Sequence, residues 1–130
     1  MWANESVFYQ IYPFGACGAP FENDHVLEHR IHKLEDFIPH LKKLKVDCIM
    51  LNPIFESRTH GYDTTDFKTL DTRLGTNEDL KEVITQFHEN EIKIILDAVF
   101  NHVGREFWAF RDVLERRWDS EYASWFEIDW

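Results

Sequence analysis

Three short stretches of the chain are mostly apolar and have the composition of buried strands. They cover residues 7–12, 46–52 and 92–96, which are rich in β-branched, aliphatic and aromatic side chains. Pro13 and Pro53 follow the first two stretches and should end them, because proline cannot donate a ladder hydrogen bond. The third stretch has a single polar residue, which is typical of a strand buried on both faces of a parallel sheet.

Apolar residues at helical spacing predict helices between these strands. The clearest pattern, i, i+3, i+4, i+7, is formed by Leu80, Val83, Ile84 and Phe87. Thr76 and Asp79 precede it at the spacing of a capping box. An earlier helix should begin near residues 35–36, because Pro39 then lies in its first turn, where a missing N–H costs nothing. A third helix is expected over 107–117.

The order of these elements indicates a barrel. Residues 54–75 are rich in Thr and Asp and are expected to form one long loop, and such loops usually carry function. The order β, α, β, loop, α, β, helix implies parallel strands joined by right-handed crossovers. About 40 residues per unit matches a (β/α)8 TIM barrel with insertions. The predicted fold is therefore α/β, with a parallel sheet and about three N-terminal units of such a barrel.

Composition and charge restrict the class of partner. The 130 residues are 44% hydrophobic and 15% aromatic, which is enough for one globular core. The net charge of −10 opposes nucleic-acid phosphates and anionic lipid surfaces, so neither partner is expected. Aromatic rings and carboxylates suit sugars instead, because sugar rings stack on aromatics and sugar hydroxyls bond to carboxylates.

The cysteines and the first residues predict a cellular location. Cys17 and Cys48 lie in or beside apolar segments without Cys-x-x-Cys spacing, so two reduced, buried thiols are favoured over a disulfide or a metal pair. Residues 1–6 show no basic region before an apolar core, so no signal peptide is expected. No apolar run reaches the about 18 residues of a membrane span. A cytoplasmic protein is the resulting expectation.

Polar side chains gather where the third strand ends. Asp97, Asn101 and His102 follow residues 92–96 and offer a carboxylate, a carboxamide and an imidazole. In a barrel, the carboxyl ends of all strands meet at one rim, where functional loops lie. The sequence therefore predicts a functional site at this rim.

Several stretches together resemble the α-amylase superfamily, glycoside hydrolase family 13. Residues 97–102, Asp-Ala-Val-Phe-Asn-His, are similar to the first conserved motif of that family. Residues 60–66 and 71–76 resemble its second loop, and residues 7–13 resemble its first strand. The segment from 107 to 126 looks most like the neopullulanase and cyclomaltodextrinase branch.

This resemblance implies an activity and a division of the chain. Residues 1–117 would be the N-terminal part of the catalytic barrel, and residues 118–130 would begin the inserted domain B. The implied activity is hydrolysis of α-1,4-glucans, maltooligosaccharides or cyclodextrins, by a retaining mechanism with a nucleophilic and an acid/base carboxylate. In the family these carboxylates come from later strands, so this chain should hold no catalytic residue and be inactive alone. A homodimer is considered for the complete protein.

The resemblance also implies roles for single residues. Tyr62 would stack beneath the sugar in the cleaved subsite, Asp63 would shape that subsite, and His102 would donate a hydrogen bond to the same sugar. Asp97 would orient neighbours, including an Arg on a later strand. Asn101 matches a calcium ligand of some relatives, but one carboxamide cannot define a site of six to eight oxygens. We therefore expect no cofactor, with calcium at Asn101 as the alternative.

Other interpretations remain open for these residues and for the chain. Tyr62 and Asp63 could belong to a solvated loop, and His102 could be a structural histidine. The remaining histidines lack metalloenzyme spacing and are expected at the surface or at helix ends: His25, His29, His32, His40, His60 and His88. The chain could instead be a non-catalytic amylase-like module that binds carbohydrate or acts as a scaffold, or a small self-contained α/β domain.

Two positions depart from the pattern of the family. Lys45 and Glu91 stand where the family usually has a glycine between a helix and the next strand. If these positions have positive φ, each side chain should cost about 1 kcal/mol of stability. The left-handed conformation could fall on Asn90 instead of Glu91.

Overall fold

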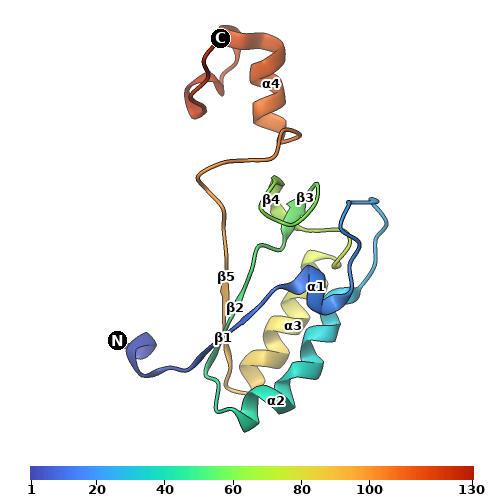
Figure 1. Ribbon diagram of the computed structural model, residues 1–130, viewed down its shortest axis with the longest axis vertical. Helices are drawn as coiled ribbons and strands as arrows, with labels where there is room; N and C mark the ends of the chain where they lie inside the picture. The colour runs from blue at the N-terminus through green and yellow to red at the C-terminus, as the bar shows by residue number, and fades with distance from the viewer.

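Three parallel strands form the main sheet of the computed structural model, which describes all of residues 1–130 (Figure 1). They are β1 (Phe8–Ile11), β2 (Cys48–Leu51) and β5 (Lys93–Leu96), in the order β1-β2-β5. The first residues of the three strands lie side by side, and so do the last. All three predicted strands are confirmed, with slightly shorter bounds than expected.

Helices connect these strands and pack beside the sheet (Figure 1). The α-helices are α1 (Pro13–Cys17), α2 (Ile38–Lys43), α3 (Asn77–Glu89) and α4 (Trp108–Arg116). The 3-10 helices are η1 (Trp2–Glu5), η2 (Arg30–Phe37), η3 (Arg117–Asp119) and η4 (Ala123–Trp125). The helix predicted from residues 35–36 begins slightly later, at Ile38, because the preceding residues form η2. Pro39 lies in the first turn of α2, as predicted.

The capping box of α3 is confirmed. The Thr76 hydroxyl accepts a hydrogen bond from the Asp79 backbone N–H at 3.2 Å, and the Asp79 carboxylate accepts one from the Thr76 N–H at 2.6 Å. Two N–H groups that lack intrahelical partners are thereby satisfied. The face predicted from the spacing is also correct, since Val83 and Phe87 are fully buried.

The prediction of one long loop over residues 54–75 is wrong. The segment contains β3 (Phe55–Ser57) and β4 (Thr64–Leu70), which pair antiparallel in a separate two-stranded sheet. Only the first and last residues of β4 are buried, so its sequence lacks the apolar alternation by which a half-buried strand is recognised. A short helix that was not predicted from the sequence, α1, follows β1; it starts at Pro13 and is capped by Gly18, which has φ 70°.

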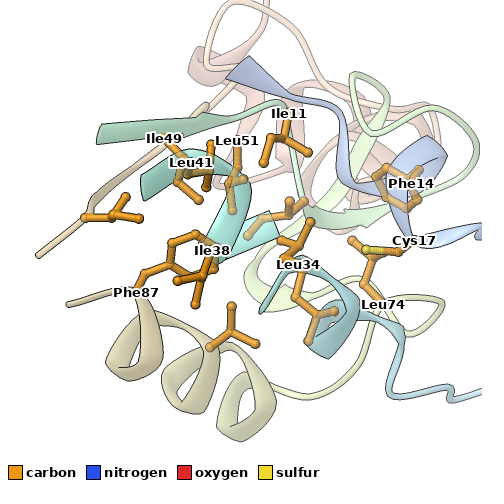
Figure 2. Close-up of a cluster of buried hydrophobic side chains, with 14 of the residues drawn as sticks. Ile11, Phe14, Cys17, Leu34, Ile38, Leu41, Ile49, Leu51, Leu74 and Phe87 are labelled. Carbon is orange, nitrogen blue, oxygen red and sulfur yellow. The ribbon is translucent and has the colours of Figure 1, made fainter. Parts of the chain in front are cut away.

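The core lies between the sheet and the helices (Figure 2). Ile11, Ile49 and Leu51 project from the strands toward Leu41 and Phe87 on the helices. The remaining members of the cluster include Phe14, Cys17, Leu34, Ile38 and Leu74. This cluster provides one continuous core for the three β/α units.

The prediction that the third strand is buried on both faces is wrong for this chain. Ile94, Ile95 and Leu96 of β5 are only partly buried, and Lys93 is exposed. β5 lies at an edge of the sheet, with β2 on one side and no strand on the other. Its long apolar run therefore has no cover on one face and along one edge.

Lys45 and Glu91 both adopt the left-handed conformation, with φ 55° and 64°. Each lies directly after the C-cap residue of a helix, Leu44 for α2 and Asn90 for α3, and both helix ends have a Schellman pattern. Val46 N–H bonds to the Leu41 carbonyl at 3.0 Å, and the N–H of Ile92 bonds to the carbonyl of Phe87 at 3.0 Å. The expectation of positive φ is confirmed, and the alternative at Asn90 is wrong because its φ is −95°.

The C-terminal segment stands apart from the sheet (Figure 1). An extended stretch after β5 leads to α4, and the residues that follow fold back on this helix. The Trp108 ring contacts the rings of Tyr122 and Trp125 at centroid distances of 4.9 and 6.0 Å. The Ser120 hydroxyl donates to the Asp112 carboxylate at 2.5 Å. α4 and the tail thus form one unit, and the domain boundary at residues 117 and 118 stays a prediction.

The two cysteines are buried and free, as predicted. Burial raises the pKa of the Cys17 thiol to about 11. No helix in the structure has both the length and the apolar character needed to cross a bilayer.

Candidate functional site

One hydrogen bond joins the two segments that were predicted to bind sugar. Nε2 of His102, in the stretch after β5, lies 2.9 Å from the carbonyl oxygen of Tyr62, in the β3–β4 hairpin. A carbonyl can only accept, so Nε2 is the donor. Tyr62 is partly buried and His102 is exposed. In this arrangement the second ring nitrogen, Nδ1, is the one that His102 presents to a ligand, and it donates to a sugar hydroxyl only when the ring is protonated.

The Tyr62 ring is fixed at its hydroxyl. Asn52 donates from Nδ2 to that hydroxyl at 2.6 Å, and its own Oδ1 accepts from Gln10 at 3.1 Å. Gln10 lies in β1 and Asn52 directly follows β2, so this chain of bonds links the tyrosine to the ends of two strands. Neither Asn52 nor Gln10 was predicted to position the site. The signal for Asn52 was its place at the carboxyl end of a predicted strand.

Asp63 is held in place by its own loop. Thr59 donates to its carboxylate from the backbone at 3.1 Å and from the hydroxyl at 2.6 Å. Burial alone would raise the pKa of Asp63, but these hydrogen bonds outweigh it and hold the pKa below the usual range. His60 Nδ1 lies 3.8 Å from the same carboxylate. Asp63 is therefore ionised at neutral pH and closes the turn beside Tyr62.

Two glycines allow the backbones around the site to approach closely. A Cβ on Gly104 would lie 2.5 Å from the Asp63 carbonyl oxygen, and a Cβ on Gly61 would lie 2.7 Å from the Pro53 oxygen. Gly61 also has φ 93°. The Gly104 N–H donates to the Thr64 carbonyl at 2.8 Å. The segment that carries His102 is thus fastened to the hairpin at a second point.

A buried ion pair lies next to the β3–β4 hairpin and is hydrogen-bonded to it. The side chains of Asp71 and Arg73 are fully buried, with 2.7 Å between Oδ2 and Nη2. Asp71 also accepts from the backbone and hydroxyl of Ser57, and Arg73 donates to the carbonyls of Pro20 and Phe21 at 3.0 and 2.8 Å. Residues 71–76 belong to the stretch that resembles the family. In this structure Asp71 and Arg73 of that stretch hold the fold together and do not contact the other predicted site residues.

The side chains of Asp97 and Asn101 make no hydrogen bond to Tyr62, Asp63 or His102. Asp97 is partly buried and Asn101 is exposed, and neither side chain makes a hydrogen bond to the protein. Asn101 supplies one oxygen of the six to eight that a calcium ion takes. The one group of three His, Cys, Asp or Glu ligands in the structure lies elsewhere, at His32, Asp79 and Glu82.

A groove beside His102 opens toward the C-terminal tail. Its walls are mostly aromatic and include Phe67, Phe100, Asn101, His102, Trp125 and Phe126. The Phe67 ring contacts the Phe100 ring at a centroid distance of 5.4 Å. Tyr62 and Asp63 do not line this groove, so His102 is the only one of the three predicted sugar-binding residues in it. Aromatic faces beside polar groups are nevertheless suited to stacking with a sugar ring.

Comparison with known proteins identifies relatives along almost the whole chain. Residues 31–129 match the family described as alpha amylase, catalytic domain. The chain is similar to a cyclomaltodextrinase of Thermoanaerobacter pseudethanolicus and to neopullulanase 2 of Thermoactinomyces vulgaris. Each is 36% identical over 98% of this chain and 25% of the relative. The chain therefore spans about a quarter of the length of these relatives.

Solved structures resemble the fold closely. The cyclic alpha-maltosyl-(1→6)-maltose hydrolase from Arthrobacter globiformis, in complex with maltose, matches 99% of this chain with 33% of its own length, at 33% identity and a TM-score of 0.82. The debranching enzyme of Nostoc punctiforme matches 99% of this chain with 31% of its own, at 30% identity and a TM-score of 0.79. The predicted α/β fold, part of a TIM barrel, is confirmed by these neighbours. The matching family model covers residues 31–129 and the relatives cover almost the whole chain, so the chain belongs to the alpha-amylase catalytic-domain family.

Proposed function

We propose that this chain is the N-terminal part of the catalytic barrel of a retaining α-1,4-glucan hydrolase that acts on maltooligosaccharides or cyclodextrins. The chain contributes one wall of the sugar-binding rim, with Tyr62, Asp63 and His102 against the substrate and with Asp97 and Asn101 in support. The hydrogen bond from His102 to the Tyr62 carbonyl carries this proposal, because it joins two segments 40 residues apart at the strand ends. The names of the relatives, cyclomaltodextrinase and maltogenic alpha-amylase, support the class of substrate.

The chemistry of the proposed reaction needs groups from outside this chain. A retaining mechanism uses a nucleophilic carboxylate and an acid/base carboxyl group about 5–5.5 Å apart. The Asp63 carboxylate is held by two hydrogen bonds from Thr59, and the Asp97 side chain makes no hydrogen bond within this chain. We assign neither residue to catalysis, and we expect residues 1–130 to be inactive alone.

The expected inactivity is tested with purified chain 1–130 and either maltotriose or a cyclodextrin. The measurement is release of reducing sugar, and no release above an enzyme-free control is expected. Turnover that disappears in Asp97→Ala would contradict the proposal, because the chemistry would then reside in this chain.

The alternative, a non-catalytic amylase-like module that binds carbohydrate or acts as a scaffold, is favoured by the aromatic groove beside His102. Maltose titration followed by tryptophan fluorescence separates the two. Saturable binding that is lost in Tyr62→Ala but kept in Tyr62→Phe supports a binding module that stacks sugar on the ring. No binding at millimolar maltose argues against this alternative.

Location and calcium binding belong to the same proposal. We place the protein in the cytoplasm, which is supported by the name of a relative from Bacillus subtilis, an intracellular maltogenic amylase. A calcium ion at Asn101 would need most of its oxygens from other segments. Addition of calcium is therefore expected to leave the melting temperature of chain 1–130 unchanged.

A further inference from the structure

A cluster of histidine and carboxylate side chains lies between η2 and the N-terminal half of α3, which pack side by side (Figure 1). His32 belongs to η2, and Asp79 and Glu82 occupy successive turns of α3. None of the three contacts Tyr62, Asp63 or His102, and the proposed hydrolase function uses none of them. The spacing of the histidines in the sequence does not reveal this cluster, because His32 lies 47 residues before Asp79.

The three ligand atoms have the spacing of a metal site. Nε2 of His32 lies 3.1 Å from Oδ1 of Asp79 and 3.8 Å from Oε2 of Glu82, and all three atoms lie within 4.8 Å of one another. Tetrahedral Zn²⁺ binds nitrogen and oxygen at about 2.0–2.2 Å, which places two ligands about 3.3–3.5 Å apart. The two distances from His32 lie on either side of that value, and the two carboxylate oxygens are at most 4.8 Å apart. A small shift of the exposed Glu82 side chain would complete the arrangement.

Neighbouring groups orient two of these ligands. Nδ1 of His32 lies 2.8 Å from Oε1 of Glu35, which is the carboxylate–histidine arrangement that supports metal-bound imidazoles. Oδ2 of Asp79 accepts from the Thr76 hydroxyl and backbone N–H and lies 2.7 Å from Nδ1 of His29. Oδ1 of Asp79 and Nε2 of His32 are therefore left facing each other. These contacts hold both ligand atoms in position before any ion binds.

We propose that His32, Asp79 and Glu82 bind one Zn²⁺ ion on the outer surface of the fold. An imidazole with two carboxylates suits zinc better than calcium or magnesium, which prefer oxygen ligands alone. The two carboxylates balance the charge of the ion, and water supplies the remaining position. The proton that Nε2 now shares with Asp79 leaves when the metal binds. The ion links η2 to α3, so binding to the folded chain stabilises it.

The test is calorimetric titration of Zn²⁺ into chain 1–130 that carries no histidine tag. We expect one ion per chain and a higher melting temperature in the presence of Zn²⁺. Glu82→Gln should weaken binding at least about 10-fold, and His32→Ala should abolish it. Glu35→Gln, which removes the support of the imidazole, should weaken binding about 10- to 100-fold. Asp79 is not substituted, because it also caps α3.

His88→Ala is the matched control, since His88 is an exposed histidine in the last turn of the same helix. This variant should bind Zn²⁺ as the parent does. Glu82 is largely exposed, so Glu82→Gln reports on binding even if His32→Ala fails to fold. Absence of one-to-one binding, or binding that Glu82→Gln leaves unchanged, would overturn the proposal and leave the cluster as ion pairs only.

Discussion

Gly104 lies so close to Asp63 that a Cβ on the glycine would be 2.5 Å from the Asp63 carbonyl oxygen. Contact at that distance forces one backbone to move, because the blocking atom belongs to the main chain. This approach brings the segment with His102 against the hairpin with Tyr62. The glycine therefore contributes to the proposed sugar site without touching a sugar.

Gly104→Ala is expected to lower the free energy of unfolding by about 1–3 kcal/mol, the usual cost of forcing extra volume into a packed site. Urea denaturation measures the change. Gly15→Ala is the control, because Gly15 lies within α1 without positive φ, and its Cβ would meet only the Tyr12 side chain. Equal effects of the two substitutions would contradict the close approach at Gly104.

The buried pair of Arg73 and Asp71 predicts a large loss of stability when one partner is removed. Arg73→Met leaves a carboxylate with no solvent exposure and without its cation. The expected cost is about 3–5 kcal/mol, measured by urea denaturation. The double substitution Asp71→Asn with Arg73→Met removes both charges and should cost less than Arg73→Met alone. An exposed pair supplies the control, since Arg116→Ala at Asp112 should change stability by at most about 1 kcal/mol.

The left-handed residues at the helix ends predict two stabilising substitutions. Lys45→Gly and Glu91→Gly should each raise the free energy of unfolding by about 1 kcal/mol, because glycine adopts φ 55° or 64° without the clash of a Cβ. Thermal or urea denaturation would detect this gain. Asn90→Gly should have the opposite effect, since Asn90 has φ −95° and gains nothing from glycine. A loss of stability in both Lys45→Gly and Glu91→Gly would show that the left-handed conformation of these two residues is not strained.

The elements that sequence alone predicts are those specified by neighbouring residues. The α3 helix was predicted because its capping box and its apolar face lie within 12 positions, from Thr76 to Phe87. The β3–β4 hairpin was missed because its support is distant in sequence. Ser57, for example, donates to Asp71, which lies 14 residues away. No local pattern of apolar residues reveals a contact of that kind.

The candidate site shows the same limit. The common rim follows from the parallel order of the strands, so the approach of Tyr62 and His102 agrees with the sequence. The particular hydrogen bonds cannot be predicted from the sequence. Nothing in it indicates that Asn52 donates to the Tyr62 hydroxyl at 2.6 Å. The burial of β5 was overestimated for a related reason. Its apolar run suits a strand with neighbours on both sides, whereas this sheet ends there.

The raised pKa of Cys17 predicts how stability and thiol reactivity depend on pH. Burial holds the pKa near 11, against an ordinary value of 9.0, because the folded core disfavours the thiolate. Below pH 9 both the folded and the unfolded chain keep the proton, and stability does not depend on this group. Above pH 9 the unfolded chain loses the proton first, so stability should fall until about pH 11. At neutral pH, a pKa higher by about two units lowers the thiolate fraction about 100-fold. Alkylation by iodoacetamide, followed by mass spectrometry of the Cys17 peptide, should therefore be at least about 100-fold slower in the folded chain than in 8 M urea, and equal rates in the two conditions would contradict the burial of this thiol.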